Sequence, residues 1–170
     1  MGKVKMFRWK AGNEYQVSDP NQQNILFGDI FEITFLAATK KLVREGITNF
    51  NHNMPERKNA LAPKPGRVRP DGLMAYKSAS GYTFANGLFF EMKAGSQKLT
   101  YTYSDKNPYQ LSAMIWVLAN MPSKENKSIK GSDVGTNAIT FVTPATDAID
   151  ESLVTYAANQ NVKIYQMETY

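Results

Sequence analysis

The stretch GLFFEMKAG, residues 87–95, places a glutamate and a lysine in the middle of an apolar strand. Alternate residues of a strand point to opposite faces, so one face is wholly apolar and the other carries Phe89, Glu91 and Lys93. The apolar face consists of Leu88, Phe90, Met92 and Ala94. Burying charged side chains is costly unless something pairs with them. The strand therefore predicts that Glu91 and Lys93 face a partner.

Hydrophobic periodicity places further helices and strands on either side of this strand. Apolar residues at helical spacing predict a helix from Ile25 to Arg44, with Gly46 as its C-terminal stop. The elements expected after it are the strands Val68–Ser78 and Tyr82–Ala94, joined as a hairpin, a helix from Pro108 to just before Pro122, the strand AITFVTP, a helix over Asp147–Ala158 and the strand NVKIYQM. The order α-β-β-α-β-α-β predicts an α/β sandwich around a central mixed sheet.

A length of 170 residues, of which 42% are hydrophobic, suits a single globular domain. Residues 1–24 are expected to be a lead-in segment, irregular or a short strand. Residues 25–143 hold the core elements, and residues 144–170 hold the closing helix and strand. The sequence has no run of eighteen apolar residues and no signal-peptide pattern, so neither a membrane-spanning segment nor a signal peptide is expected.

Charge and composition narrow the possible chemistry. Twenty Lys and Arg against fifteen Asp and Glu give a net charge of +5, which favours an anionic partner, most commonly nucleic acid. The chain has no cysteine and a single histidine, His52, which excludes a His/Cys zinc site and any nuclease site that needs two histidines. His52 lies in the polar segment NFNHNMPERKN and is expected to be a solvated loop residue.

An acid two residues before a lysine occurs three times, but only Glu91/Lys93 lies in an apolar strand. The segment RPDG, residues 69–72, opens the preceding predicted strand. If the two strands pair antiparallel, Asp71 comes close to Glu91, and two carboxylates held together repel unless a divalent cation lies between them. Mg²⁺ suits such oxygen ligands. Lys93 can then orient or help deprotonate the attacking water, or neutralise charge on a phosphate.

RPDG followed by FFEMK resembles the motif of the PD-(D/E)xK nucleases, the restriction-endonuclease-like phosphodiesterases. The resemblance implies a restriction-endonuclease-like α/β/α sandwich and metal-dependent cleavage of DNA with Mg²⁺ or Mn²⁺. Asp71 and Glu91 would be metal ligands, the Met92 backbone carbonyl would complete the shell with waters, and Lys93 would be the catalytic lysine. Glu32, in GDIFEITF, matches the glutamate that many members add from the first helix, acting on the metal directly or through water. Gln110, in NPYQLSAM, matches a glutamine that several members place early in the second helix.

Two further segments bear on partners. A run of basic residues without an intervening acid precedes the motif and can track a phosphate backbone, although a solvated loop is an equal alternative. It consists of Arg57, Lys58, Lys64, Arg67 and Arg69. The tail FVTPATDAIDESLVTYAANQNVKIYQMETY resembles the closing helix and strand of nuclease toxin domains in bacterial polymorphic toxins and secretion-system effectors.

The toxin resemblance implies delivery by a secretion system into the cytoplasm of a target cell, and neutralisation by an immunity protein. Because the surface to be blocked is basic, that inhibitor is expected to be acidic. Two other readings remain open. One is a cytoplasmic housekeeping or phage endonuclease for repair or junction processing. The other is a basic nucleic-acid-binding domain that carries out no chemistry.

Overall fold

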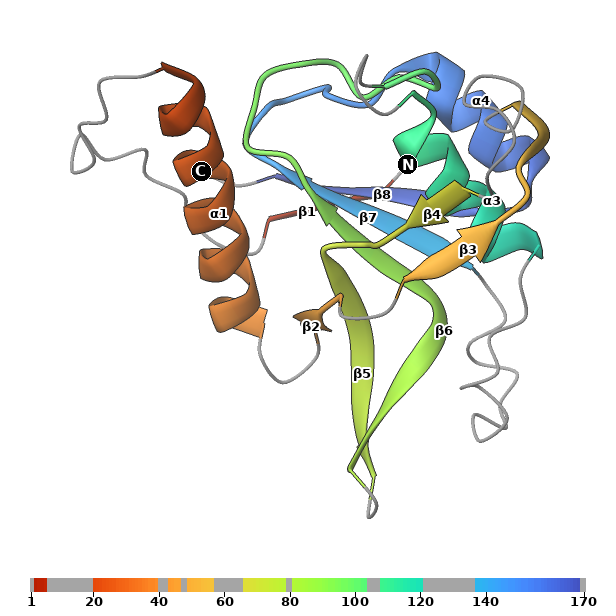
Figure 1. The fold of residues 1–170 in the computed structure, drawn as a ribbon, viewed down its shortest axis with the longest axis horizontal. Coiled ribbons are helices and arrows are strands. Elements are labelled where there is room, and N and C mark those ends of the chain that lie inside the picture. Colours follow the sequence, from red (N-terminus) through yellow and green to blue (C-terminus); the bar gives the residue numbers. More distant parts are fainter. Residues whose placement is uncertain are drawn as a thin grey trace.

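The computed structural model describes residues 2–5, 20–39, 43–46, 49–56, 66–78, 81–103, 108–120 and 137–168. The chain is an α/β protein with a mixed sheet and three helices in the described part (Figure 1). Its elements are β1 (Gly2–Lys5), α1 (Pro20–Thr39), β2 (Val43–Glu45), β3 (Phe50–His52), β4 (Gly66–Val68), β5 (Gly72–Ser78), β6 (Gly81–Met92), α3 (Gln110–Asn120), β7 (Ala138–Thr143), α4 (Glu151–Asn159) and β8 (Lys163–Glu168).

Six strands form the central sheet in the order β1-β8-β7-β6-β5-β2. The pairs β1–β8, β8–β7 and β7–β6 are parallel, whereas β6–β5 and β5–β2 are antiparallel. Strands β3 and β4 form a separate two-stranded sheet. In Figure 1 the β5–β6 hairpin extends well beyond the other strands. The predicted mixed sheet is therefore confirmed, and the short strands β2 and β3 are additions to the elements expected from the sequence.

Helix α1 lies on one face of the sheet, and α3 and α4 lie on the other (Figure 1). The two faces of β6 follow the alternation expected from its sequence. Phe90 and Met92 pack in a buried cluster with Phe31 and Phe35 of α1. Phe89 belongs to the larger cluster beneath α3 and α4. The sheet is thus covered on both sides, and Glu91 points to the face covered by α3.

The first helix ends earlier than its periodicity predicts. It runs from Pro20 to Thr39 instead of from Ile25 to Arg44, and residues 43–45 form β2, which pairs with β5. Gly46 is therefore not a helix stop but the residue that follows an edge strand. The predicted strand Val68–Ser78 is also divided, because β4 ends at Val68 and β5 begins at Gly72. Pro70 lies in the interruption, and it has no N–H to donate to a ladder.

Other differences lie at the ends of elements. Residues 2–5, within the predicted lead-in, form β1 and pair with β8. The last helix begins at Glu151 instead of Asp147, because the Asp150 side chain caps it by accepting a hydrogen bond from the Ser152 amide at 2.9 Å. His52 was expected to be solvated but is only 3% exposed, on β3, where its Nδ1 accepts from the Met54 amide. In the described part of the chain no helix has the length and apolar character to span a membrane.

Candidate active site at the end of strand β6

Glu91 is the centre of a polar cluster at the C-terminal end of β6. Its side chain is completely buried. The Lys93 Nζ lies 2.6 Å from its Oε1, and the Gln110 Nε2, from the first residue of α3, lies 3.4 Å from the same oxygen. The Asp71 amide lies 3.4 Å from Oε2. The Lys93 ammonium, the Gln110 side-chain amide and the Asp71 backbone amide, from three residues that the sequence singled out, therefore surround the Glu91 carboxylate.

Asp71 lies where the β5–β6 ladder ends. Gly72 is paired with Phe90, so Asp71 and Glu91 occupy the next positions along the two strands. There each carboxylate accepts a hydrogen bond from the opposite strand: the Met92 amide donates to the Asp71 Oδ2 at 2.7 Å, and the Asp71 amide donates to Glu91. These bonds hold both carboxylates against the backbone of the sheet. The antiparallel pairing of β5 and β6, which the sequence predicted, brings the two residues close together.

The RPDG segment is held in place by the end of β2. The Gly46 amide donates to the Asp71 carbonyl at 2.9 Å. A Cβ atom on Gly46 would lie 1.6 Å from the Pro70 carbonyl oxygen, so no other residue fits without moving the chain. The Arg69 guanidinium donates to the Gly46 carbonyl and to Glu45 at 2.9 Å. Sequence reasoning missed Glu45 and Gly46, because their partners are more than twenty residues away and no local pattern marks them.

Glu32, on α1, lines a pocket of about 540 Å³ together with Asp71. We call it the acidic pocket; its lining residues are Asp29, Glu32, Ile33, Leu36, Glu45, Arg69 and Asp71. Four carboxyl side chains and one guanidinium face the same space, so a phosphate group entering it would be repelled without added positive charge. Glu32 and Asp71 thus line the same pocket, but Glu32 makes no direct bond to Glu91 among the described contacts.

Burial raises the pKa of the three predicted acids, Asp71, Glu91 and Glu32. Burial, with the Asp71 charge in addition, raises the pKa of Glu91 to about 8, although Lys93 opposes the shift. Burial also raises the pKa of Asp71, again opposed by Lys93. The pKa of Glu32 is raised to about 7 by burial, and by the charges of Asp71 and Glu45. The pKa values of Glu91 and Glu32 lie near or above neutral pH, so an additional cation would stabilise the ionised form of these two side chains.

Lys93 stays protonated in this cluster. Burial alone would lower the pKa of Lys93, but the carboxylates of Glu91 and Asp71 outweigh it and raise the pKa to about 12. The ammonium is therefore a fixed positive charge at neutral pH. This favours the charge-neutralising role over the proton-accepting role, both of which the sequence had left open.

The donor set fits a magnesium or manganese ion with a partly aqueous shell. In the described part of the chain, no three His, Cys, Asp or Glu side chains gather closely enough to hold a metal on their own. Mg²⁺, however, is commonly held by one or two carboxylates and several waters. Asp71 and Glu91 could provide two such carboxylates on a rigid frame. The roles of the Met92 carbonyl and of Glu32 as further ligands stay predictions.

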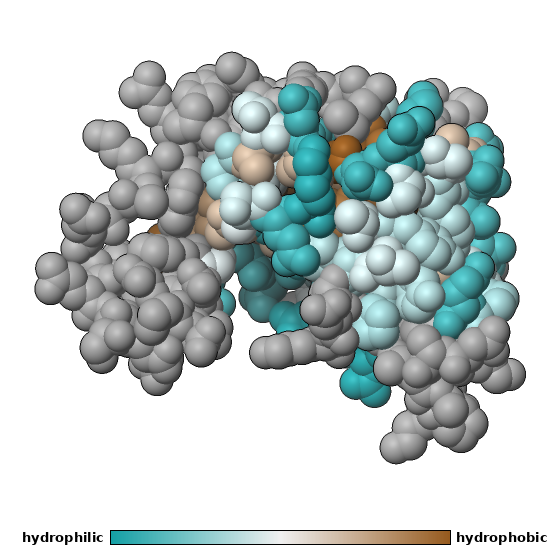
Figure 2. All heavy atoms as spheres, turned by 90° about the horizontal axis from the view of Figure 1, so that it is seen from above, coloured by the Kyte–Doolittle hydropathy of each residue, from teal (hydrophilic) through white to brown (hydrophobic). Residues whose placement is uncertain are grey.

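Of the predicted nucleic-acid-binding residues, Arg67 and Arg69 are described, and Arg57, Lys58 and Lys64 lie outside the described residues. Arg67 is exposed on β4, and Arg69 binds Glu45 and Gly46 as above. Figure 2, which views the molecule from above, shows hydrophilic residues over most of the described surface, with hydrophobic residues in small areas between them. Contact of these arginines with a phosphate backbone stays a prediction.

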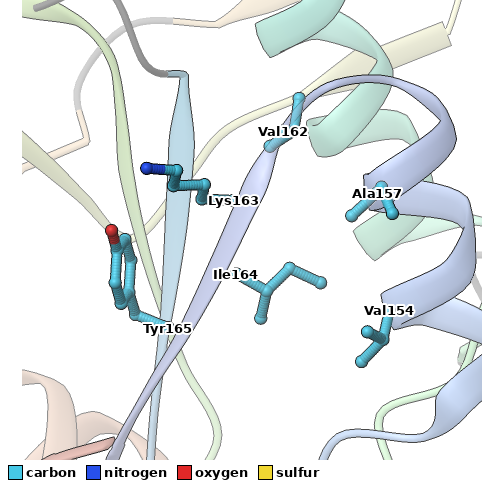
Figure 3. Close-up of a pocket in the computed structure, with 7 residues that line it drawn as sticks. Val154, Ala157, Val162, Lys163, Ile164 and Tyr165 are labelled. Carbon is cyan, nitrogen blue, oxygen red and sulfur yellow. The ribbon is translucent and has the colours of Figure 1, made fainter. Parts of the chain in front are cut away.

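A second pocket, of about 320 Å³, lies between α4 and β8. In Figure 3, Val154 and Ala157 from the helix point toward Ile164 on the strand, while Lys163 and Tyr165 point to the other side of the strand. We call it the apolar pocket; Ala158 and Val162 complete its lining. It contains no carboxylate, so it offers no site for a cation.

Comparison of the chain with protein-family models, with curated proteins and with solved structures finds no significant match to any of the three.

Proposed function

We propose that this protein is a metal-dependent DNA endonuclease of the restriction-endonuclease-like α/β/α fold. One observation carries the proposal: Asp71, Glu91, Lys93 and Gln110 meet at the end of β6 through hydrogen bonds of 2.6–3.4 Å. Two carboxylates and an ammonium on a rigid sheet suit phosphodiester hydrolysis, because the reaction places negative charge on the phosphate in its transition state.

In the proposed reaction, Asp71 and Glu91 would hold a magnesium or manganese ion, which would supply positive charge and lower the pKa of a water molecule. The Lys93 ammonium neutralises charge that develops on the phosphate oxygens. Gln110 keeps the Glu91 carboxylate in position from the start of α3. The paired bonds of Asp71 and Glu91 to backbone amides limit the movement of both acids during the reaction.

DNA as the substrate is supported by charge. The chain carries a net charge of +5, and the exposed Arg67 lies on β4, close in sequence to the motif. The acidic pocket accepts a phosphate only when cations offset its carboxylates, which agrees with a metal-dependent reaction. The direct test is incubation of the purified protein with supercoiled plasmid, with Mg²⁺, with Mn²⁺ and with EDTA. Cleavage with either metal and none with EDTA is expected; no cleavage under any condition would overturn the proposal.

A pair of lysine variants separates chemistry from binding. Lys93→Ala should lower the cleavage rate by roughly 10²-fold or more, because it removes the charge next to the reacting phosphate. Lys163→Ala, which removes an exposed lysine on β8 beside the apolar pocket, should cleave at the parental rate. DNA binding by both variants should be nearly parental. If Lys93→Ala cleaves as fast as the parent, the lysine is structural, and a binding domain without chemistry becomes the better account.

We further propose that the nuclease acts as an antibacterial toxin domain that an acidic immunity protein neutralises. The resemblance of residues 141–170 to the end of nuclease toxin domains supports this role. Expression of the domain alone in a bacterial cytoplasm should stop growth, and co-expression of the product of the neighbouring reading frame should restore it. Harmless expression, with no neighbouring product that binds, would favour a housekeeping or phage nuclease instead.

A further inference from the structure

The Lys93 ammonium has an aromatic neighbour as well as a carboxylate. The Lys93 Nζ lies 5.6 Å from the centroid of the Tyr103 ring, within the range of a cation–π interaction. The Lys93 side chain is only 19% exposed. A cation that is largely withdrawn from water gains more from such a ring than an exposed cation does. The ring is therefore placed where it affects the position of the ammonium.

The segment that carries Tyr103, residues 99–103, is fastened to the residues that lead into α4 and to its first turn. The Leu99 amide donates to the Ala148 carbonyl at 2.8 Å, and the Leu99 carbonyl accepts from the Asp150 amide at 3.1 Å. The Tyr101 amide donates to the Ser152 Oγ at 3.2 Å. The partners in these bonds lie just before and just after the N-terminus of α4, so residues 99–103 are held in place along their length.

The same segment is also tied to α3 and closed on itself. The buried Ser112 hydroxyl, on α3, donates to the Tyr101 carbonyl at 2.9 Å. The Tyr103 amide donates to the Thr100 carbonyl at 3.1 Å, which closes a tight turn just before the ring. Tyr101 and Tyr103 both pack against the main hydrophobic cluster. Tyr103 is thus held on a frame that includes α3 and α4, the two helices covering the Glu91 side of the sheet.

We propose that Tyr103 is a positioning residue for Lys93, holding its ammonium beside Glu91 and toward the reacting phosphate. A lysine side chain has four flexible carbons, and one ion pair alone leaves it several conformations. The Tyr103 ring is a second contact of the ammonium, which adds to the ion pair with Glu91 and restricts the Lys93 side chain further. The effect on catalysis rests on the nuclease function proposed above, whereas the contact itself does not.

The contact can be tested by NMR on the metal-free protein, without any activity. In protein labelled with ¹³C-lysine, the ε-CH₂ signals of Lys93 are those that disappear in Lys93→Arg. A ring facing the ammonium should shift these signals upfield. The shift should persist in Tyr103→Phe and disappear in Tyr103→Leu. Tyr156→Leu is the matched control, because it removes another half-buried tyrosine of the same cluster and should leave the Lys93 signals unchanged.

The catalytic consequence is tested with the same variants. Tyr103→Leu should lower kcat about tenfold with KM nearly unchanged, and Tyr103→Phe should restore kcat to within about twofold of the parent. If Tyr103→Leu does not fold, Tyr103→Met replaces it. Unchanged Lys93 signals in the folded ringless variant would overturn the contact, and an unchanged kcat would overturn the positioning role. A parent that shows the shift but cleaves no DNA would overturn the nuclease function while supporting the contact.

Discussion

The acidic pocket and the apolar pocket both include residues of the central sheet, from β2 and β8 respectively, but the chemical character of their linings is opposite. The acidic pocket is lined by four carboxyl groups. Burial raises the pKa of two of them, Glu32 and Asp71, and of the neighbouring Glu91. The apolar pocket is lined mainly by aliphatic side chains. Burial of carboxylates opposes folding, whereas burial of aliphatic groups favours it.

This contrast indicates what each region is for. A protein gains no stability from ionised acids held close together, so their presence at the end of β6 points to function. The apolar pocket is explained by packing alone. Substitutions at the acidic pocket should therefore affect cleavage more than stability, and substitutions at the apolar pocket should do the reverse.

Among residues outside the catalytic cluster, the largest expected effect comes from Gly46→Ala. The added Cβ cannot occupy its place 1.6 Å from the Pro70 carbonyl oxygen, so Pro70 and Asp71 must move. Misplacement of a metal-binding carboxylate by about 1 Å can reduce a reaction rate by about 10²-fold. Plasmid cleavage by Gly46→Ala should fall by about that factor.

Gly28→Ala provides the matched control. Gly28 lies in α1, and an added Cβ there meets nothing within 4 Å. Alanine favours a helix interior over glycine by about 1 kcal/mol, so this variant should be at least as stable as the parent and fully active. If Gly46→Ala cleaves like Gly28→Ala, the end of β2 does not position Asp71.

Ile164→Ala should have the opposite effect, lowering stability while leaving cleavage unchanged. Ile164 is buried on β8 at the apolar pocket, and its truncation should cost about 2–4 kcal/mol of unfolding free energy. Thermal unfolding should show a Tm lower by roughly 10 °C. Cleavage per folded molecule, measured well below that Tm, should stay parental. A folded variant with a large loss of cleavage would mean that the apolar pocket contributes to the active site.

The smallest expected effect concerns pH. Because the pKa of Glu32 is raised to about 7, the folded protein binds its proton more tightly than the unfolded chain does. Ionisation therefore opposes folding: the penalty is absent below about pH 4.5 and is complete above about pH 7. In EDTA the Tm should decrease as the pH rises through this range, and less steeply for Glu32→Gln. If the Tm of the parent and of Glu32→Gln changes equally with pH, ionisation of Glu32 does not destabilise the folded protein.

Local sequence patterns were sufficient for β6 and its faces. In this strand Phe89 and Glu91 point to one face of the sheet, and Phe90 and Met92 point to the other. This arrangement follows from the two-residue repeat of any strand, so no distant contact is needed to predict it. The convergence of Asp71 with Glu91 followed from antiparallel pairing of adjacent strands. Gln110 was placed by its position at the start of α3. These features needed little information beyond each element and its neighbour in sequence.

Features that depend on distant contacts were missed. Residues 43 and 44 belong to the helix predicted from the sequence but pair with β5 as part of β2. Gly46 is required by Pro70, and His52 is buried because β3 pairs with β4 and its ring lies near Trp116. The pairing of Lys93 with Tyr103 likewise depends on how residues 99–103 are fastened to α4. None of these partners is adjacent in sequence.

Calorimetric titration with Mg²⁺ or Mn²⁺ tests the central claim, that Asp71 and Glu91 form a metal site, most directly. The parent protein should bind the ion, and Asp71→Ala should bind it at least about tenfold more weakly, because one of two carboxylate ligands is lost. Asp29→Ala, which removes a different acid from the acidic pocket, should bind nearly as the parent does. Equal affinity of the parent and Asp71→Ala for both ions would contradict the assignment of this site.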